Sequence, residues 1–298
     1  MDLTHACVFL FTPGHAPQRF DKGLRSGADG VILDLEDAVA LTDKEAARGH
    51  VFDWLARRTP SATQGQPLVC IRVNSLDSAF VEADNRALVQ ALQRGHGPDL
   101  VMVPKVESAA ALAGLVAGWS AVGAALPGVI ALIESARGLE QVAAIAQACP
   151  QVVALGFGGA DLAADLGCEF AWEPLLYARG RMVQAAALAR VALLDVPYLA
   201  VKDAAGLALE TRRVKALGFT GKLAIHPEQV GVIIQSLLPS ASEVQFAQAI
   251  VEAAQSSPSG VRVVAGRMVD EPVVAAARRV LARHARATVP DFSERSVA

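Results

Sequence analysis

The segment GVILDLED, residues 30–37, begins with an apolar run and contains three acidic side chains at its end. A short run rich in Val, Ile and Leu predicts a strand buried on both faces, as the strands of a parallel sheet are. Similar runs recur along the chain between longer helical stretches. The eight predicted strands are Cys7–Pro13, Gly30–Glu36, Pro67–Val73, Asp99–Lys105, Gly128–Ser135, Gln151–Gly158, Pro197–Lys202 and Gly221–His226.

The stretches between these strands are amphipathic or Ala-rich and long enough for crossover helices. Examples are Thr42–Arg58, Ser78–Arg94, Ala136–Cys149 and Asp203–Leu217. Eight such units predict an α/β fold of the TIM (β/α)8 barrel type. The alternative is a doubly wound open sheet, which predicts a Gly-rich dinucleotide-binding motif after an early strand. The sequence contains no such motif, so the barrel is favoured.

A C-terminal tail follows the eighth predicted strand. It contains helical stretches at about Pro227–Leu238 and Ser242–Gln255, then Val261–Asp270 and a basic helix at Pro272–Arg286. The tail is too short for an independent domain. We therefore expect a catalytic barrel over residues 1–238 and a C-terminal helical extension over residues 239–298, packed on a barrel or on a neighbouring subunit.

Composition narrows the class of protein. Of the 298 residues, 53% are hydrophobic and 19% are charged, which is typical of a chain with a large buried core. The net charge of −3, from 27 basic and 30 acidic residues, provides no basic stripe for binding nucleic acid. The four cysteines lack CxxC spacing, so neither a zinc site nor a disulfide framework is expected. Without a secretory or membrane-spanning segment, the chain is expected to be cytoplasmic, with no membrane partner.

Polar side chains gather at the carboxyl ends of the predicted strands, where barrel enzymes keep their active sites. A charge at a single strand end commonly does no more than solvate that end. Charges at nearly all eight ends, with mostly Gly, Pro and Gln at the opposite ends, instead predict one shared site. In strand order these residues are Asp34, Glu36, Asp37, Arg72, Asn74, Lys105, Glu107, Glu134, Asp161, Lys202, Asp203 and His226.

Glu134 and Asp161 follow neighbouring strands and could supply the hard oxygen ligands that Mg²⁺ prefers. The alternative for either carboxylate is a salt bridge or a helix N-cap, and Asp161 is well placed for a cap. Arg72 suits bidentate binding of a substrate carboxylate. It could equally form a structural ion pair with Asp34 or Glu36.

Two further positions are ambiguous. His226 could be a general base, a ligand or, most commonly, an ordinary hydrogen-bonded histidine. Arg19 lies where a Pro- and Gly-containing loop, residues 13–19, enters a basic helix. Such a helix start can hold a phosphate, although basic residues on a helix more often form a solvated face.

Taken together, several segments resemble one family. They are LFTPGHAPQRFDKGLRSGADGVILDLEDAV (10–39), IRVN (71–74), VMVPKVES (101–108), ALIESARGL (131–139), LGFGGADLAADLG (155–167), AIHPEQV (224–230) and GRMVDEPVVAAARRVLA (266–282). These motifs, in this order, resemble the citrate lyase beta subunit-like branch of the HpcH/HpaI aldolase superfamily. The resemblance spans residues 8 to about 282.

The resemblance implies a Mg²⁺-dependent barrel, a homo-oligomer of three or six subunits, that cleaves or forms a bond between an acyl thioester and a 2-oxo acid. In it, Glu134 and Asp161 match metal ligands, and Arg72 matches an arginine that binds the substrate carboxylate. Arg19 matches a contact to the phosphates of CoA. Asp270 matches an acid that reaches a neighbouring subunit's active site, where we expect it to move a proton. The alternative is that Asp270 caps the following helix.

Glu36 and Asp37 are expected beside the substrate, bonded to metal-bound water. The implied reaction is cleavage of a 3-hydroxyacyl thioester of the citryl-CoA, malyl-CoA or citramalyl-CoA type, and the thioester carrier could be CoA or an acyl-carrier protein. One alternative is a class II pyruvate-type aldolase acting on free hydroxy-oxo acids. Another is a non-catalytic thioester-binding subunit, which an intact set of Glu134, Asp161 and Arg72 disfavours.

Overall fold

The structure is a computed structural model that describes residues 3, 8–58, 66–120, 123, 125–256 and 262–287. The chain divides into two compact units, Met1–Ile233 and Ile234–Ala298, which are described separately below. The domain boundary predicted from the sequence, between residues 238 and 239, stays a prediction.

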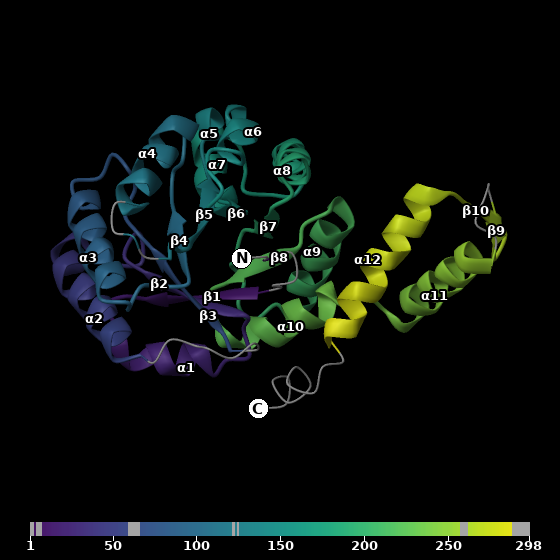
Figure 1. Cartoon of the computed structure of the whole chain (residues 1–298), viewed down its shortest axis with the longest axis horizontal. Helices are drawn as coiled ribbons and strands as arrows, with labels where there is room; N and C mark the ends of the chain where they lie inside the picture. Colours follow the sequence, from purple (N-terminus) through teal and green to yellow (C-terminus); the bar gives the residue numbers. More distant parts are fainter. Residues whose placement is uncertain are drawn as a thin grey trace. The chain divides into compact units, whose positions relative to one another are not determined.

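The first unit is a closed barrel of eight parallel strands (Figure 1). Each strand pairs with the next along the chain, and the last pairs with the first. The strands are β1 (Val8–Pro13), β2 (Gly30–Asp34), β3 (Leu68–Arg72), β4 (Leu100–Val103), β5 (Gly128–Ile133), β6 (Val152–Phe157), β7 (Ala192–Asp195) and β8 (Gly221–Ala224). The predicted TIM barrel is confirmed.

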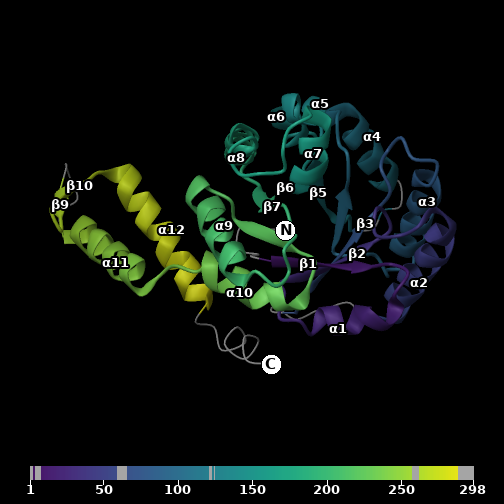
Figure 2. The same cartoon turned by 180° about the vertical axis from the view of Figure 1, so that it is seen from behind.

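Helices cover the outside of the barrel, as both views show (Figures 1 and 2). Along this part of the chain they are η1 (Pro17–Arg19), α1 (Phe20–Leu24), η2 (Leu41–Asp43), α2 (Lys44–Arg57), α3 (Val81–Gln93), α4 (Ala109–Ser120), α5 (Ala136–Glu140), α6 (Val142–Ile145), α7 (Gly159–Leu166), α8 (Leu176–Ala189), α9 (Ala204–Leu217) and α10 (Pro227–Leu237). In the described residues no helix is long and apolar enough to cross a membrane.

Alternate side chains of the strands enter two different cores. Ile32, Cys70 and Leu132 belong to a cluster made almost entirely of strand residues, which fills the inside of the barrel. Val31 and Leu33 belong to a larger cluster shared with the surrounding helices. Residues i and i+2 of a strand point to the same face. The residues that lie two positions after Ile32, Cys70 and Leu132 therefore continue the inner face toward the carboxyl end of the barrel.

The prediction for the seventh strand was wrong. The strand is Ala192–Asp195, and the predicted segment Pro197–Lys202 is irregular. All four residues of β7 are buried, whereas Leu199 is largely exposed. Proline also has no N–H to donate to a central sheet. Lys202 and Asp203 therefore do not end a strand, and Asp203 instead caps α9 by accepting a hydrogen bond from the backbone N–H of Gly206.

The other seven strands lie where the sequence predicted them, with shorter bounds. The prediction for the first strand included Cys7, which lies outside the described residues.

The second unit contains α11 (Ala241–Ser256), a hairpin of β9 (Arg262–Val264) and β10 (Arg267–Val269), and α12 (Glu271–Ala287). The two helices agree with the predicted helical extension, and the hairpin joins them. A small core holds this unit together. Its buried residues are Ala247, Ile250, Val269, Val274 and Ala277.

Candidate active site

Three buried charged side chains continue the inner face of the barrel at its carboxyl end: Asp34, Arg72 and Glu134. Each lies two residues beyond an inward-facing apolar residue, so the strand geometry itself aims it into the mouth. A cavity of about 480 Å³ opens beside Glu134, and Lys105 and Asp161 are also among its lining residues. This is the end of the barrel at which barrel enzymes carry out catalysis.

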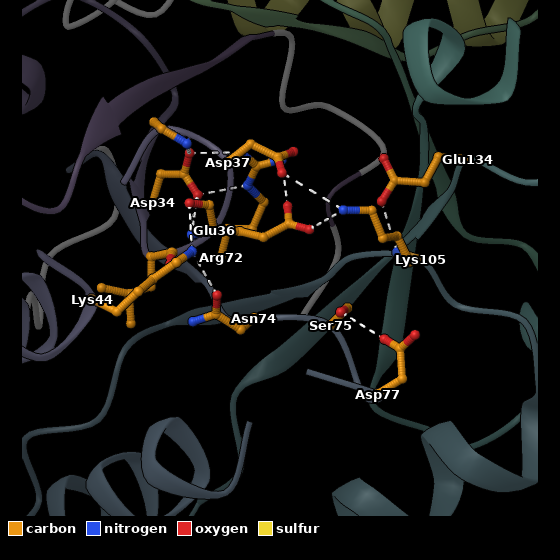
Figure 3. Close-up of polar contacts among 12 residues, drawn as sticks. Asp34, Glu36, Asp37, Lys44, Arg72, Asn74, Ser75, Asp77, Lys105 and Glu134 are labelled. Carbon is orange, nitrogen blue, oxygen red and sulfur yellow. Dashed lines mark hydrogen bonds and ion pairs between the residues drawn. The ribbon is translucent and has the colours of Figure 1, made fainter. Parts of the chain in front are cut away.

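Arg72 is held mainly by acidic side chains of the β2 end (Figure 3). Its Nε and Nη2 donate to Asp34 Oδ1 and Oδ2 at 2.7 and 2.6 Å, a bidentate pair. Its Nη1 lies 2.9 Å from Glu36 Oε2 and 3.4 Å from Asp37 Oδ2. The ion pair that the sequence left open for Arg72 is therefore present, and the guanidinium also lies over the ring of Phe11.

Lys44, the first residue of α2, is buried and supports the loop that carries this acidic cluster. Its Nζ donates to the carbonyl oxygens of Leu35 and Glu36 at 2.8 and 2.7 Å, and to Asn74 Oδ1 at 2.7 Å. Asn74 in turn donates from its backbone and side-chain nitrogens to the buried Asp84. The loop that carries Glu36 is thus tied to the neighbouring strand end.

Sequence reasoning missed Lys44, but a signal was available. Lys44 shares one helix face with Ala47, Val51 and Leu55, which are spaced as a buried stripe. A lysine on such a stripe buries its alkyl stem, and an ammonium that does not reach water requires acceptors.

Glu134 is buried, and its Oε1 accepts a hydrogen bond of 2.7 Å from the backbone N–H of Lys105. Gly158 leaves room for it, since a Cβ there would lie 2.4 Å from Glu134 Cβ and 2.5 Å from Oε2. Burial, followed by the negative charges of Glu36 and Asp161, raises the pKa of Glu134 to about 8. The carboxyl group is therefore crowded by like charge in a poorly solvated place.

Asp161 lies in the first turn of α7 and is exposed. The N-cap residue of α7 is Gly158, and no side chain caps this described helix end. Asp161 therefore does not act as the N-cap, which was its alternative role. Asp161 and Glu134 line the same cavity, and the charge of Asp161 reaches Glu134 strongly enough to shift its pKa. The structure brings the two predicted metal ligands together.

This pair fits a magnesium ion. Mg²⁺ takes one or two carboxylates and completes its coordination with water and substrate, and a divalent charge would relieve the repulsion that raises the pKa of Glu134. Among the described residues no group of three or more His, Cys, Asp and Glu side chains that could hold a metal ion is found. The proposed donor set is the two carboxylates alone, which would leave coordination positions for water and substrate.

Three other predicted positions lie apart from this cavity or in the second unit. Arg19 ends η1 and is exposed. The Nδ1 of His226 accepts a hydrogen bond from the backbone N–H of Glu228, which is the ordinary structural alternative. Asp270 Oδ1 accepts a hydrogen bond of 3.3 Å from the backbone N–H of Val273, so the helix-capping alternative for Asp270 is present.

A barrel whose mouth combines two neighbouring carboxylates with an arginine held by further carboxylates defines a class: metal-dependent enzymes that bind small anionic substrates. The chain belongs to the HpcH/HpaI aldolase/citrate lyase family, which matches residues 8–227. The family resemblance and the lyase class predicted from the sequence are confirmed.

Similar proteins include the citrate lyase subunit beta of Leuconostoc mesenteroides subsp. cremoris, 33% identical over 92% of this chain and 91% of the relative. The L-malyl-CoA/beta-methylmalyl-CoA lyase of Cereibacter sphaeroides is also 33% identical, over 88% of this chain and 89% of the relative. A similar solved structure is CitE from Mycobacterium tuberculosis in complex with magnesium, acetoacetate and coenzyme A. It is 33% identical, with a TM-score of 0.79, and covers 95% of this chain and 100% of CitE. Magnesium, the predicted cofactor, is thus bound by a member of this family.

Proposed function

We propose that this protein is a Mg²⁺-dependent carbon–carbon lyase that cleaves a 3-hydroxyacyl thioester into an acyl thioester and a 2-oxo acid. The observation that carries the proposal is the pairing of Glu134 with Asp161 in the cavity at the barrel mouth. Relatives named for citrate lyase and malyl-CoA lyase activity support the thioester class.

Glu134 and Asp161 are the residues that would hold the ion, and Mg²⁺ bound there supplies a Lewis acid for substrate oxygens. In the cleavage, the substrate hydroxyl loses its proton and becomes the carbonyl oxygen of the 2-oxo acid, while the adjacent carbon–carbon bond breaks. The electron pair of that bond passes to the thioester enolate, whose carbon then takes up a proton. One proton is lost and one is gained, so the reaction needs no oxidant or reductant.

Arg72 provides the positive charge that offsets the charge developing in this step. Its bidentate pair with Asp34 engages Nε and Nη2, so a substrate carboxylate would meet the guanidinium on its Nη1 side, which lies near Glu36 and Asp37. Glu36 and Asp37 would then contact substrate or metal-bound water rather than the ion itself.

The remaining roles in the proposal come from the family. Arg19 would contact the phosphates of CoA, and Asp270 would enter the active site of a neighbouring subunit of a trimer or hexamer to move the proton of the enolate carbon. A cytoplasmic location, expected from the sequence, completes the proposal.

A panel of citryl, malyl and citramalyl thioesters tests the function, with release of 2-oxo acid followed in Mg²⁺ and in EDTA. Each acyl group is offered on CoA and on an acyl-carrier protein. The proposal predicts release from at least one thioester in Mg²⁺ only, and none by Glu134→Gln. Cleavage of free hydroxy-oxo acids alone would identify an aldolase, and thioester binding without turnover would identify a non-catalytic subunit.

A further inference from the structure

Lys105 has an unusual backbone conformation, with φ of +50° in the loop after β4. Side chains other than glycine avoid this left-handed region because Cβ crowds the carbonyl oxygen. In the part of the chain that is described, two other non-glycine residues share it. Arg190 ends α8 and Ala265 lies in the hairpin turn, both ordinary places for a left-handed residue. Lys105 lies at neither a helix end nor a hairpin turn, and it lines the active-site cavity.

The conformation presents the backbone N–H of Lys105 to Glu134, whose Oε1 accepts it at 2.7 Å. Glu134 is buried, and among the described residues the Lys105 N–H is the hydrogen-bond donor to its carboxylate. The orientation of the proposed metal ligand therefore depends on the backbone of Lys105.

The side chain of Lys105 reaches in another direction, toward the acidic cluster (Figure 3). Its Nζ donates to Glu36 Oε1 at 2.7 Å and lies 3.6 Å from Asp37 Oδ1. Glu36 is itself fixed, because Arg72 pairs with its carboxylate and Lys44 binds its carbonyl oxygen. The side chain of Lys105 is 41% exposed, and its partial desolvation lowers its pKa, but the hydrogen bond to Glu36 and the surrounding carboxylates outweigh this and raise the pKa. The ammonium is thus a charged anchor on a rigid support.

We propose that Lys105 is a positioning residue for Glu134: the ion pair between its ammonium and Glu36 holds the loop in the left-handed conformation, and that conformation aims its N–H at the metal-binding carboxylate. The proposal rests on the metal site of the proposed function. In this role, Lys105 links the acidic cluster around Arg72 to Glu134, so one residue sets the position of these two parts of the site relative to each other.

Two substitutions separate this role from a simple effect of charge. Lys105→Met removes the anchor but keeps the unfavourable Cβ, so the loop should relax and withdraw its N–H from Glu134. Lys105→Gly also removes the anchor, but glycine adopts positive φ without strain, so the N–H should stay in place. Removing a nearby positive charge without any movement would instead tighten the binding of a divalent cation in both variants.

The probe is Mn²⁺, titrated into the chain of residues 1–298 and followed by electron paramagnetic resonance of the free ion. We expect Lys105→Met to weaken binding about tenfold, as loss of a residue that orients a metal ligand commonly does. Lys105→Gly should stay within about twofold of the wild type, because glycine restores the conformation. Lys202→Met, which removes an exposed lysine that does not line the cavity, is the matched control. Unchanged or tighter binding by Lys105→Met, or equal losses in the Met and Gly variants, would overturn the proposal.

Hydrogen exchange of the Lys105 amide provides a readout that needs neither metal nor activity. In metal-free protein the amide should be protected in the wild type and in Lys105→Gly, and unprotected in Lys105→Met. Protection that is the same in all three proteins overturns the positioning role even if the lyase activity is found. Conversely, the expected exchange pattern in a protein that cleaves no thioester leaves the positioning role intact and refutes only the proposed function.

Discussion

Asp34 and Arg72 lie opposite each other in the register of β2 and β3, and their side chains form a bidentate ion pair inside the barrel mouth. Both are buried, so each charge offsets much of the free-energy cost of burying the other. Asp34 also accepts hydrogen bonds from the backbone N–H groups of Glu36 and Ala38. The pair therefore shapes the loop that carries the rest of the acidic cluster.

The first prediction concerns the planar fork of Arg72. Lysine keeps the charge but cannot bind Asp34 bidentately, so Arg72→Lys should lower kcat/KM about a hundredfold, the scale of losing one preorganised charge-stabilising group. Steady-state kinetics measure the loss, and circular dichroism should show the fold retained. Arg86→Lys, in an exposed pair with Glu82 on α3, is the control and should be neutral. Near-normal kcat/KM in Arg72→Lys would make the arginine a purely structural partner.

The second prediction concerns pH. Burial, with the charges of Glu36 and Asp161, raises the pKa of Glu134 to about 8. Protons therefore compete with Mg²⁺ below that pH, and the affinity for Mg²⁺ should rise by up to about tenfold per pH unit toward pH 8, then level off. Calorimetry in buffers of different ionisation enthalpy should detect release of a proton at pH 7. A flat affinity between pH 6 and 8 without proton release would show that no protonated Glu134 has to ionise when the ion binds.

The third prediction concerns the space that Gly158 leaves for Glu134. A Cβ there would lie 2.4 Å from Glu134 Cβ, so Gly158→Ala should displace the carboxylate and weaken Mg²⁺ binding by about 10- to 100-fold. Gly180→Ala in α8 meets nothing within 4 Å and should leave binding unchanged. If the two variants bind Mg²⁺ equally well, the position of Glu134 does not depend on this contact.

The barrel could be predicted because its strands are short buried runs, and a run such as residues 30–34 has the same appearance in any parallel sheet. The seventh strand could not be placed correctly. Its four residues directly follow an Ala-rich helix, whereas the exposed segment 197–202 is apolar enough to resemble a strand. Exposure, which decides between them, is a property of the folded chain.

Much of the candidate site was predicted by one rule, that polar strand ends of a barrel converge, and the two residues that it paired, Glu134 and Asp161, line one cavity. The rule could not say which charges neutralise each other. The bidentate hold of Asp34 on Arg72 depends on strand register, and the role of Lys105 depends on a single backbone angle. Neither is encoded by a periodic pattern of apolar residues.

The fourth prediction concerns Asp270 and the shared active site. Asp270 caps α12, and asparagine caps a helix about as well as aspartate. Asp270→Asn should therefore leave the fold intact while removing the charge, and the proposed proton transfer with it. Mixed oligomers of inactive Asp270→Asn and inactive Glu134→Ala subunits should regain activity, because some interfaces then hold one complete site. Verified mixed oligomers without activity would refute a shared site.

The proposed lyase activity depends on one divalent ion held by Glu134 and Asp161 together. Anomalous diffraction from crystals soaked in Mn²⁺ tests it most directly, because manganese replaces magnesium at oxygen sites and scatters anomalously. We expect a single strong peak at the barrel mouth, within about 2.0–2.4 Å of one carboxylate oxygen of each residue. The peak should be lost in Glu134→Gln and in Asp161→Asn. A peak bound to neither carboxylate, or one that survives both substitutions, would show that these two residues do not hold the ion.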